Sequence, residues 1–268
     1  STLVSMIPEA EATGRCEIRP LSTVYRIKTG KQGRAEEVLY VDAQGLQQAQ
    51  KARAVILAAN GAETPRLLLM SDGPDHPDGL SNGSGLVGKY LMGNGHSMIH
   101  GYFEHELNDW KSIQVTRIVH DFYATDPKRG FYGGGGMDGR PLVNSMPVLH
   151  AMTEADAGGK RWGAEFKRNV RHGFNRHMGI LSSTTSVPVE SNNITLDPNA
   201  EDAIGRPLVR MTYRDHDDDL AMMQFLQDRG NEILEAAGAQ RIWREPVVPQ
   251  TAHAHLLGTC RMGTNAAN

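Results

Sequence analysis

The feature that most constrains the fold is an apolar run at residues 52–59, Ala-Arg-Ala-Val-Ile-Leu-Ala-Ala, which ends at Asn60 and Gly61. An apolar run of this length is typical of a strand buried in a sheet. Thr64 suits a helix N-cap and Pro65 the first helical position, so a helix is expected to follow. The pattern therefore predicts a strand, a turn and a helix. Such a turn either contacts a ligand or simply connects two elements, and the residues alone do not distinguish these two roles.

Short segments before this run predict a β-hairpin. Residues 16–19 and 24–27 suit one kinked strand or two short ones, and residues 37–42 follow a Gly-Lys-Gln-Gly turn. Glycine-containing turns between such segments are typical of hairpins. We therefore expect antiparallel strands in this part of the chain.

After about residue 98 the pattern changes to longer and more polar strands. Residues 187–197 suggest strand, turn and strand, and residues 207–213 add another strand. Aspartates at 217–219 favour the start of a helix that is apolar on one face and ends near Gly238. The four glycines at 133–136 are not followed by Gly-Lys-Ser/Thr, so we expect a mobile surface loop there and not a phosphate loop.

Composition excludes several classes of protein. A net charge of −3, without a dense Lys/Arg stripe, argues against a nucleic-acid partner. Cys16 and Cys260 are too few for a disulfide framework and leave the redox compartment open. No apolar run reaches the roughly 18 residues that a transmembrane segment needs. The chain begins at Ser1 with neither an initiator Met nor a signal-peptide pattern, which indicates a fragment or an internal start.

A literal G-x-G-x-x-G occurs at residues 83–88. The dinucleotide fingerprint needs a strand before it and a helix opening from it. Here a Pro/Asp/Gly-rich loop at 72–81 precedes it and Lys89-Tyr-Leu-Met follows. We therefore expect a loop that packs closely against another part of the chain, and not a nucleotide site.

Three segments, taken in order, resemble the glucose-methanol-choline (GMC) family of FAD-dependent oxidoreductases. Residues 57–71, Leu-Ala-Ala-Asn-Gly-Ala-Glu-Thr-Pro and a Leu-rich helix, are similar to a conserved family segment. Residues 85–92, Gly-Leu-Val-Gly-Lys-Tyr-Leu-Met, resemble the segment before the family's flavin-contacting Asp-His. Residues 255–263, His-Leu-Leu-Gly-Thr-Cys-Arg-Met-Gly, look like the signature around its active-site histidine. Within the family the likeness is greatest to flavin subunits of bacterial gluconate, fructose or glucose dehydrogenases.

The resemblance implies a two-domain fold of the α+β or α/β class. Residues 1–97 would form a partial FAD-binding domain that lacks its first βαβ unit. Residues 98–247 would form a substrate-binding domain, a mainly antiparallel sheet with helices on one side. Residues 248–268 would return to the FAD-binding domain. The chain is thus expected to be a fragment that lacks both ends of such a protein.

The resemblance also assigns roles to individual residues. It implies a backbone contact from Val24 to the adenine and a close approach of residues 59–61 to the flavin nucleotide. The Asp-His region of the family corresponds here to Gly93-Asn-Gly-His, so its register is open. The residues implied to contact FAD are Val24, Ala59, Asn60, Gly61, Asn94 and His96, and His255 is the implied catalytic histidine.

The chemistry suits a histidine at position 255. Alcohol oxidation by a flavin needs hydride transfer to flavin N5 while a base receives the hydroxyl proton, and a histidine titrates near neutral pH. Two other readings of His255 stay open: an ordinary buried histidine, or a metal ligand together with His253, for which no third ligand is evident. The family's second active-site residue is expected beyond Asn268.

The resemblance implies FAD-dependent oxidation of an alcohol group on a sugar, sugar acid or polyol, with electrons passed to an acceptor other than oxygen. An electron-acceptor subunit is a possible partner, and the bacterial periplasm or cytoplasm is the expected location. The alternative is a non-catalytic truncated or split chain that binds a sugar or a partner subunit. By itself the chain is expected to bind FAD weakly or not at all.

Overall fold

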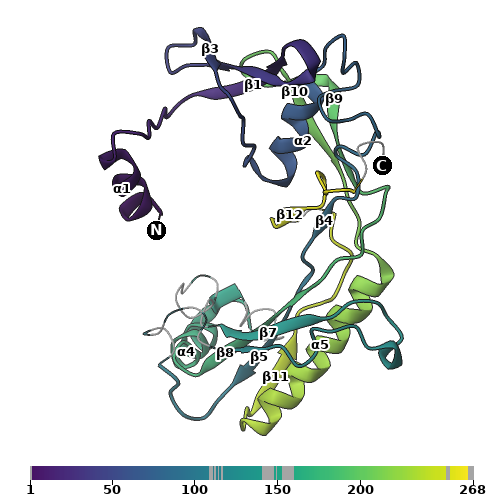
Figure 1. Ribbon diagram of the computed structural model, residues 1–268. Coiled ribbons are helices and arrows are strands. Elements are labelled where there is room, and N and C mark those ends of the chain that lie inside the picture. Colours follow the sequence, from purple (N-terminus) through teal and green to yellow (C-terminus); the bar gives the residue numbers. More distant parts are fainter. Residues whose placement is uncertain are drawn as a thin grey trace. The chain divides into compact units, whose positions relative to one another are not determined.

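The computed structural model divides the chain into two compact units. The first unit comprises Ser1–Lys89, Ile194–Met211 and Thr259–Asn268, and the second comprises Tyr90–Asn193 and Thr212–Gly258 (Figure 1). The residues that the structure describes are 2–108, 111, 113, 115, 117–140, 148, 150–152, 160–251 and 254–264.

An antiparallel sheet of three strands organises the first unit, in the order β1-β2-β3. Its strands are β1 (Thr23–Thr29), β2 (Ala35–Val41) and β3 (Gln47–Lys51). The β1–β2 pairing confirms the expected hairpin. Strand β3 was not expected because its residues are all polar or small and exposed, so only its backbone pairing with β2 defines it.

The remaining elements of the first unit are two helices, two short 3₁₀ turns and a second hairpin. They are listed by their bounds: η1 (Thr2–Val4), α1 (Met6–Ala12), η2 (Lys31–Gly33), α2 (Asn60–Met70), β9 (Asn193–Glu201) and β10 (Pro207–Thr212), of which β9 and β10 pair with each other.

The prediction of a buried strand at 52–59 is wrong. These residues have no regular secondary structure, and the side chain of Ile56 is 91% exposed. A buried strand needs neighbouring strands to satisfy its backbone groups, and none of the described strands pairs with this run. Helix α2 also begins at Asn60, before the expected N-cap Thr64, and Pro65 lies inside it.

A five-stranded antiparallel sheet organises the second unit, in the order β11-β5-β8-β7-β6. The long helix α5 (Asp217–Ala236) packs against its central strands. This arrangement confirms the expected antiparallel sheet with helical cover on one side. The strands of the sheet are β5 (His96–Tyr102), β6 (Ile118–Val119), β7 (Gly135–Arg140), β8 (His177–Thr184) and β11 (Arg241–Arg244).

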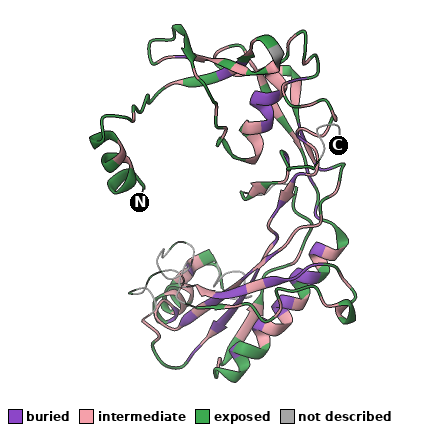
Figure 2. Ribbon diagram, viewed as in Figure 1, coloured by how far each residue is buried: buried purple, intermediate pink, exposed green. Residues whose placement is uncertain are grey.

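The core of the second unit lies between α5 and this sheet (Figure 2). It contains Ile99, Phe103, Met137, Ile180, Met222, Leu226 and Leu234, each at most 5% exposed.

The ends of α5 agree with the sequence. His216 is the N-cap, and its side chain and that of Asp219 form a capping box. Gly238 follows the helix with φ of +84°.

Smaller elements complete the second unit. They are β4 (Met92–Gly93), η4 (Pro127–Arg129), α4 (Gly163–Gly173) and β12 (Leu256–Leu257), and β12 pairs with β4. No helix among the described residues is long and apolar enough to cross a membrane.

The glycine run at 133–136 is not the surface loop that its composition suggested. Gly135 and Gly136 belong to β7, and Gly133, Gly134 and Gly135 are buried. A Cβ atom on Gly134 would lie 2.1 Å from the carbonyl oxygen of Tyr123. Glycine is therefore needed here because another backbone segment passes too close for a side chain.

Candidate active site

His255 and His96 lie side by side in the second unit. Their ring centroids are 4.9 Å apart and the ring planes meet at 72°. Pairing of β12 with β4, Leu256 opposite Gly93, places His255 next to the segment that leads into β5. The side chain of His255 is exposed and that of His96 is half-buried. An exposed imidazole held beside a second one is accessible to a bound molecule and can take up a proton from it.

Local backbone geometry helps to fix His255. Gly258, just after β12, has φ of +91°, and a Cβ there would lie 2.3 Å from the carbonyl oxygen of Tyr90. The next residue, Thr259, is buried. Glycine at position 258 thus allows a close contact with the backbone of Tyr90 that a larger residue would prevent.

A cavity of about 530 Å³ lies on the same sheet of the second unit, and we call it the sheet cavity. Asn94 and Leu257, two residues from His96 and His255, both line it. Ser183, another lining residue, is the register partner of His96, and opposite residues of an antiparallel pair share one face. The two histidines do not line the sheet cavity themselves, but residues two positions from each of them do.

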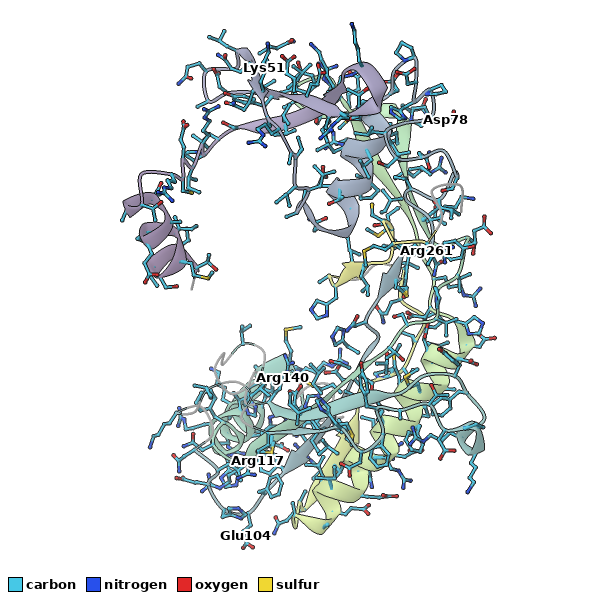
Figure 3. All side chains as sticks on the ribbon, viewed as in Figure 1. Lys51, Asp78, Glu104, Arg117, Arg140 and Arg261 are labelled. Carbon is cyan, nitrogen blue, oxygen red and sulfur yellow. The ribbon has the colours of Figure 1, made fainter. Side chains whose placement is uncertain are left out.

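The charged groups of the sheet cavity come from β7. Asp138 and Arg140 are two positions apart in the strand and so point to the same face. Arg140 Nη2 lies 3.2 Å from Asp138 Oδ2, and its Nε contacts Asp138 Oδ1. Asp138 is 8% exposed. Figure 3 labels Arg140 on this sheet. The remaining polar lining residues include His120, Tyr123, Thr184, Thr185 and Ser186.

Sequence reasoning missed Asp138, Arg140 and His120. Spacing of two in a strand would have placed Asp138 and Arg140 on one face, but residues 133–136 had been taken for a loop. The strand that carries these side chains was therefore not expected.

The other predicted cofactor residues belong to the first unit. Val24 lies in β1 and is 41% exposed. Ala59 and Asn60 are exposed at the start of α2, and the Gly61 carbonyl accepts a hydrogen bond from Thr259 Oγ1 at 2.7 Å. Asn60 has φ of +66°, and its side-chain oxygen accepts the backbone N–H groups of Ala62 and Glu63. The amide of Asn60 therefore already caps its own helix.

Within the first unit, the backbone around residues 58–60 fits an extended anionic ligand. The side chains of Ala58 and Ala59 are small and exposed, so they leave the main chain accessible. The start of α2 also carries the positive end of the helix dipole, which suits a phosphate group. Of the predicted residues, the structure brings Asn94, His96 and His255 together in one unit and Ala59, Asn60 and Gly61 together in the other.

A larger cavity, of about 640 Å³, lies in the first unit between α2, β1 and β9. None of the predicted site residues lines it, and its Arg26 is already paired with Asp72 at 2.7 Å. We assign the site to the smaller sheet cavity because residues two positions from each of the two histidines line it.

Three further histidines of the second unit form a buried cluster. His100 Nδ1 and His177 Nε2 are 3.0 Å apart, and His100 Nε2 lies 3.0 Å from Glu245 Oε1. His150 packs against His177. Burial, and after it the nearby His100, His150 and Arg241, lower the pKa of His177 to about 2. His177 is therefore neutral at physiological pH and packs as part of the interior.

Metal binding finds no support in the described part of the chain, where no three His, Cys, Asp or Glu side chains are arranged to hold an ion. His253, the proposed second ligand beside His255, lies outside the described residues.

Residues 188–268 match a family model described as GMC oxidoreductase. The chain is 34% identical over 262 residues to 2-methyl-1,2-propanediol dehydrogenase of Mycolicibacterium austroafricanum, covering 96% of this chain and 47% of the relative. It is 29% identical over 245 residues to the gluconate 2-dehydrogenase flavoprotein of Pantoea cypripedii, covering 89% and 39%. A formate oxidase of Aspergillus oryzae gives a TM-score of 0.49 at 14% identity, covering 81% of this chain and 43% of that one. The chain thus spans less than half the length of these relatives.

Proposed function

Because this chain is related to the GMC oxidoreductases, we propose that it supplies the substrate cavity and the histidine base of an FAD-dependent alcohol dehydrogenase. The observation that carries the proposal is the pair His96–His255 beside a polar cavity. Residues 1–97 and 248–268 would serve mainly the cofactor and residues 98–247 the substrate, while His255 supplies the base and Asn94 and Leu257 line the substrate cavity.

FAD is the cofactor that the family implies, and the exposed backbone at the start of α2 fits it. In this proposal Val24, Ala59, Asn60 and Gly61 contact the cofactor from the first unit. When bound, the flavin would supply the hydride acceptor for oxidation of a carbinol carbon.

The residues of this chain would bind the substrate and accept its proton. Polar groups of the sheet cavity bind the substrate hydroxyls, and Nδ1 or Nε2 of His255 receives the proton of the reacting hydroxyl. His96, edge-on to His255, orients that ring, and Asn94 contributes a hydrogen-bonding amide beside it. We further propose an electron acceptor other than oxygen, carried by a separate subunit; the names of the relatives as dehydrogenases support this.

The test replaces the base in the purified gene product that contains this chain. His255→Gln should slow flavin reduction by an alcohol substrate about 10²- to 10⁴-fold, the usual contribution of a general base, and leave the flavin absorbance spectrum unchanged. His105→Gln changes an exposed histidine of the same unit and should leave the rate unchanged. Equal rates in His255→Gln and the unchanged protein would refute the assignment. A gene product that binds a sugar but no flavin would support the non-catalytic alternative.

A further inference from the structure

The charge of the sheet cavity is balanced within its own wall. Among its described lining residues Arg140 is the one lysine or arginine, and Asp138 is the one carboxylate. The two are joined by an ion pair on one face of β7. A carboxylate entering the cavity would have to compete with Asp138 for the guanidinium of Arg140. Asp138 is held in the same strand, two residues from Arg140, and is largely buried. The guanidinium is therefore already neutralised before a substrate binds.

Three of the hydroxyl groups that line the cavity donate to backbone carbonyl oxygens. Thr184 Oγ1 donates to the carbonyl oxygen of Gly95 at 3.2 Å, and Thr185 Oγ1 donates to that of Gly134 at 3.1 Å. Ser186 Oγ donates to the carbonyl oxygen of Gly93. A carbonyl oxygen can only accept, so the protons of these three hydroxyls are not available to a carboxylate in the cavity.

A wall of this kind discriminates between two substrates of equal size. Hydroxyl groups of a polyol can donate to Asp138 and accept from Arg140 without carrying a charge into the cavity. A carboxylate only accepts, so it gains no hydrogen bond from these three hydroxyls and meets no uncompensated cation to offset its loss of water.

We propose that the sheet cavity selects neutral polyhydroxy alcohols and rejects sugar acids, and that the Asp138–Arg140 pair is the specificity-determining element. The inference rests on the proposed function, since it places the substrate of that reaction in this cavity. Asp138 would accept a hydrogen bond from one substrate hydroxyl, and Arg140 would donate one to a neighbouring oxygen.

Sorbitol and gluconate test the proposal, because they share one polyhydroxy carbon chain and differ only in a terminal hydroxymethyl or carboxylate group. Calorimetric titration of the purified gene product should give a Kd for sorbitol at least about tenfold below that for gluconate, a difference on the scale of one hydrogen bond to a charged group. Kd values are measured without turnover, and flavin reduction by each compound is measured separately.

Variants test the ion pair itself. Asp138→Asn keeps the shape but leaves Arg140 without its counter-charge, so gluconate binding should tighten about tenfold and the selectivity should shrink or invert. Arg140→Gln is the complementary variant and should weaken gluconate binding further. Asp121→Asn removes the same charge from an exposed residue of the neighbouring turn and should change the Kd ratio less than about twofold, because exposed charges are screened.

Two results would overturn the selectivity: gluconate binding as tightly as sorbitol in the unchanged protein, or a Kd ratio that Asp138→Asn does not move. Failure of the proposed function looks different. In that case sorbitol still binds selectively and the Asp138→Asn effect still appears, but no alcohol reduces the flavin. If both compounds reduce the flavin with equal efficiency, the function stands and the selectivity does not.

Discussion

The two units of the chain bury their apolar residues in different ways. In the second unit α5 covers a five-stranded sheet and seals a cluster of seven core residues. In the first unit the buried apolar residues are fewer and dispersed, for example Tyr25, Ile27 and Leu67, while Ile56 and Leu21 are 91% and 80% exposed. A long amphipathic helix on a sheet can supply a closed core, whereas short hairpins and one helix bury fewer apolar side chains.

One arginine links two segments of the first unit. Arg66 of α2 reaches the β9–β10 hairpin: Nη2 lies 2.6 Å from Asp202 Oδ2, and Nε donates to the carbonyl oxygen of Pro207 at 2.8 Å. Burial works to lower the pKa of Arg66, but the hydrogen bonds and charges of Asp202 and Glu63 raise it overall. The guanidinium therefore stays charged and joins segments far apart in sequence.

The comparison predicts that loss of an aliphatic side chain lowers the free energy of unfolding strongly at a buried position of the second unit and little at an exposed position of the first. Leu226→Ala should lower the free energy of unfolding by about 2–5 kcal/mol, because Leu226 is fully buried and a cavity would remain. Ile56→Ala should change it by less than about 0.5 kcal/mol, because the side chain is exposed. Urea denaturation followed by circular dichroism measures both. An Ile56→Ala loss as large as that of Leu226→Ala would show that residues 52–59 are covered in the gene product.

Glycine substitutions provide the second contrast. Gly134→Ala should destabilise the second unit by about 1–3 kcal/mol because its Cβ would collide with backbone. Gly73→Ala, in the first unit, has nothing within 4 Å of a new Cβ and a φ outside the left-handed region. It should be neutral or stabilise by up to about 1 kcal/mol through the unfolded state. Thermal unfolding curves of the two variants measure both changes. Equal losses of stability would contradict the close approach of Gly134 to the backbone of Tyr123.

The third contrast is the pH dependence that His177 gives to the second unit. Its pKa is about 2 in the folded protein and near 6.5 when unfolded, so below pH 6.5 the unfolded state binds more protons. Its contribution is complete above pH 6.5, and the free energy of unfolding falls as pH decreases from 6.5 toward the folded pKa, by roughly 1 kcal/mol for each pH unit.

The His177→Gln variant should flatten this pH dependence, and the exposed-site variant His105→Gln should not. Fluorescence of Trp243, which packs against His177, reports the unfolding of this unit. A slope unchanged in His177→Gln would contradict the neutral buried state.

Local patterns predicted the parts of the fold that local interactions determine. Helix α5 carries its own N-terminal aspartates and a terminal Gly238, and the β1–β2 hairpin carries its own turn. The run at 52–59 is equally apolar, but a strand needs partners that its own sequence cannot supply. Strand β7 was missed for the same reason, because the glycines at 134–136 are explained by close contacts with Tyr123, Ser183 and His120, which lie in other segments.

Prediction of the site shows the same limit. A resemblance of short motifs picked out Asn94, His96 and His255, and the structure brings these three together, although their roles stay predictions. It gave no indication of Asp138 or Arg140, because their place in the wall of the sheet cavity depends on the register of β7 and β8. Site residues whose positions depend on pairing between distant strands cannot be predicted from local sequence patterns.

The hydrogen bond between Thr259 and Gly61 has a consequence for biosynthesis. It joins positions 198 residues apart, and the second unit consists of segments that the ribosome makes between them. At about 5–20 residues per second, the start of α2 would wait about 10–40 s for this contact. The whole second unit would emerge in that interval. Translation therefore allows the second unit to be complete before the first unit can form this contact. Until then, exposed apolar residues of the first unit such as Ile56 would be accessible to chaperones.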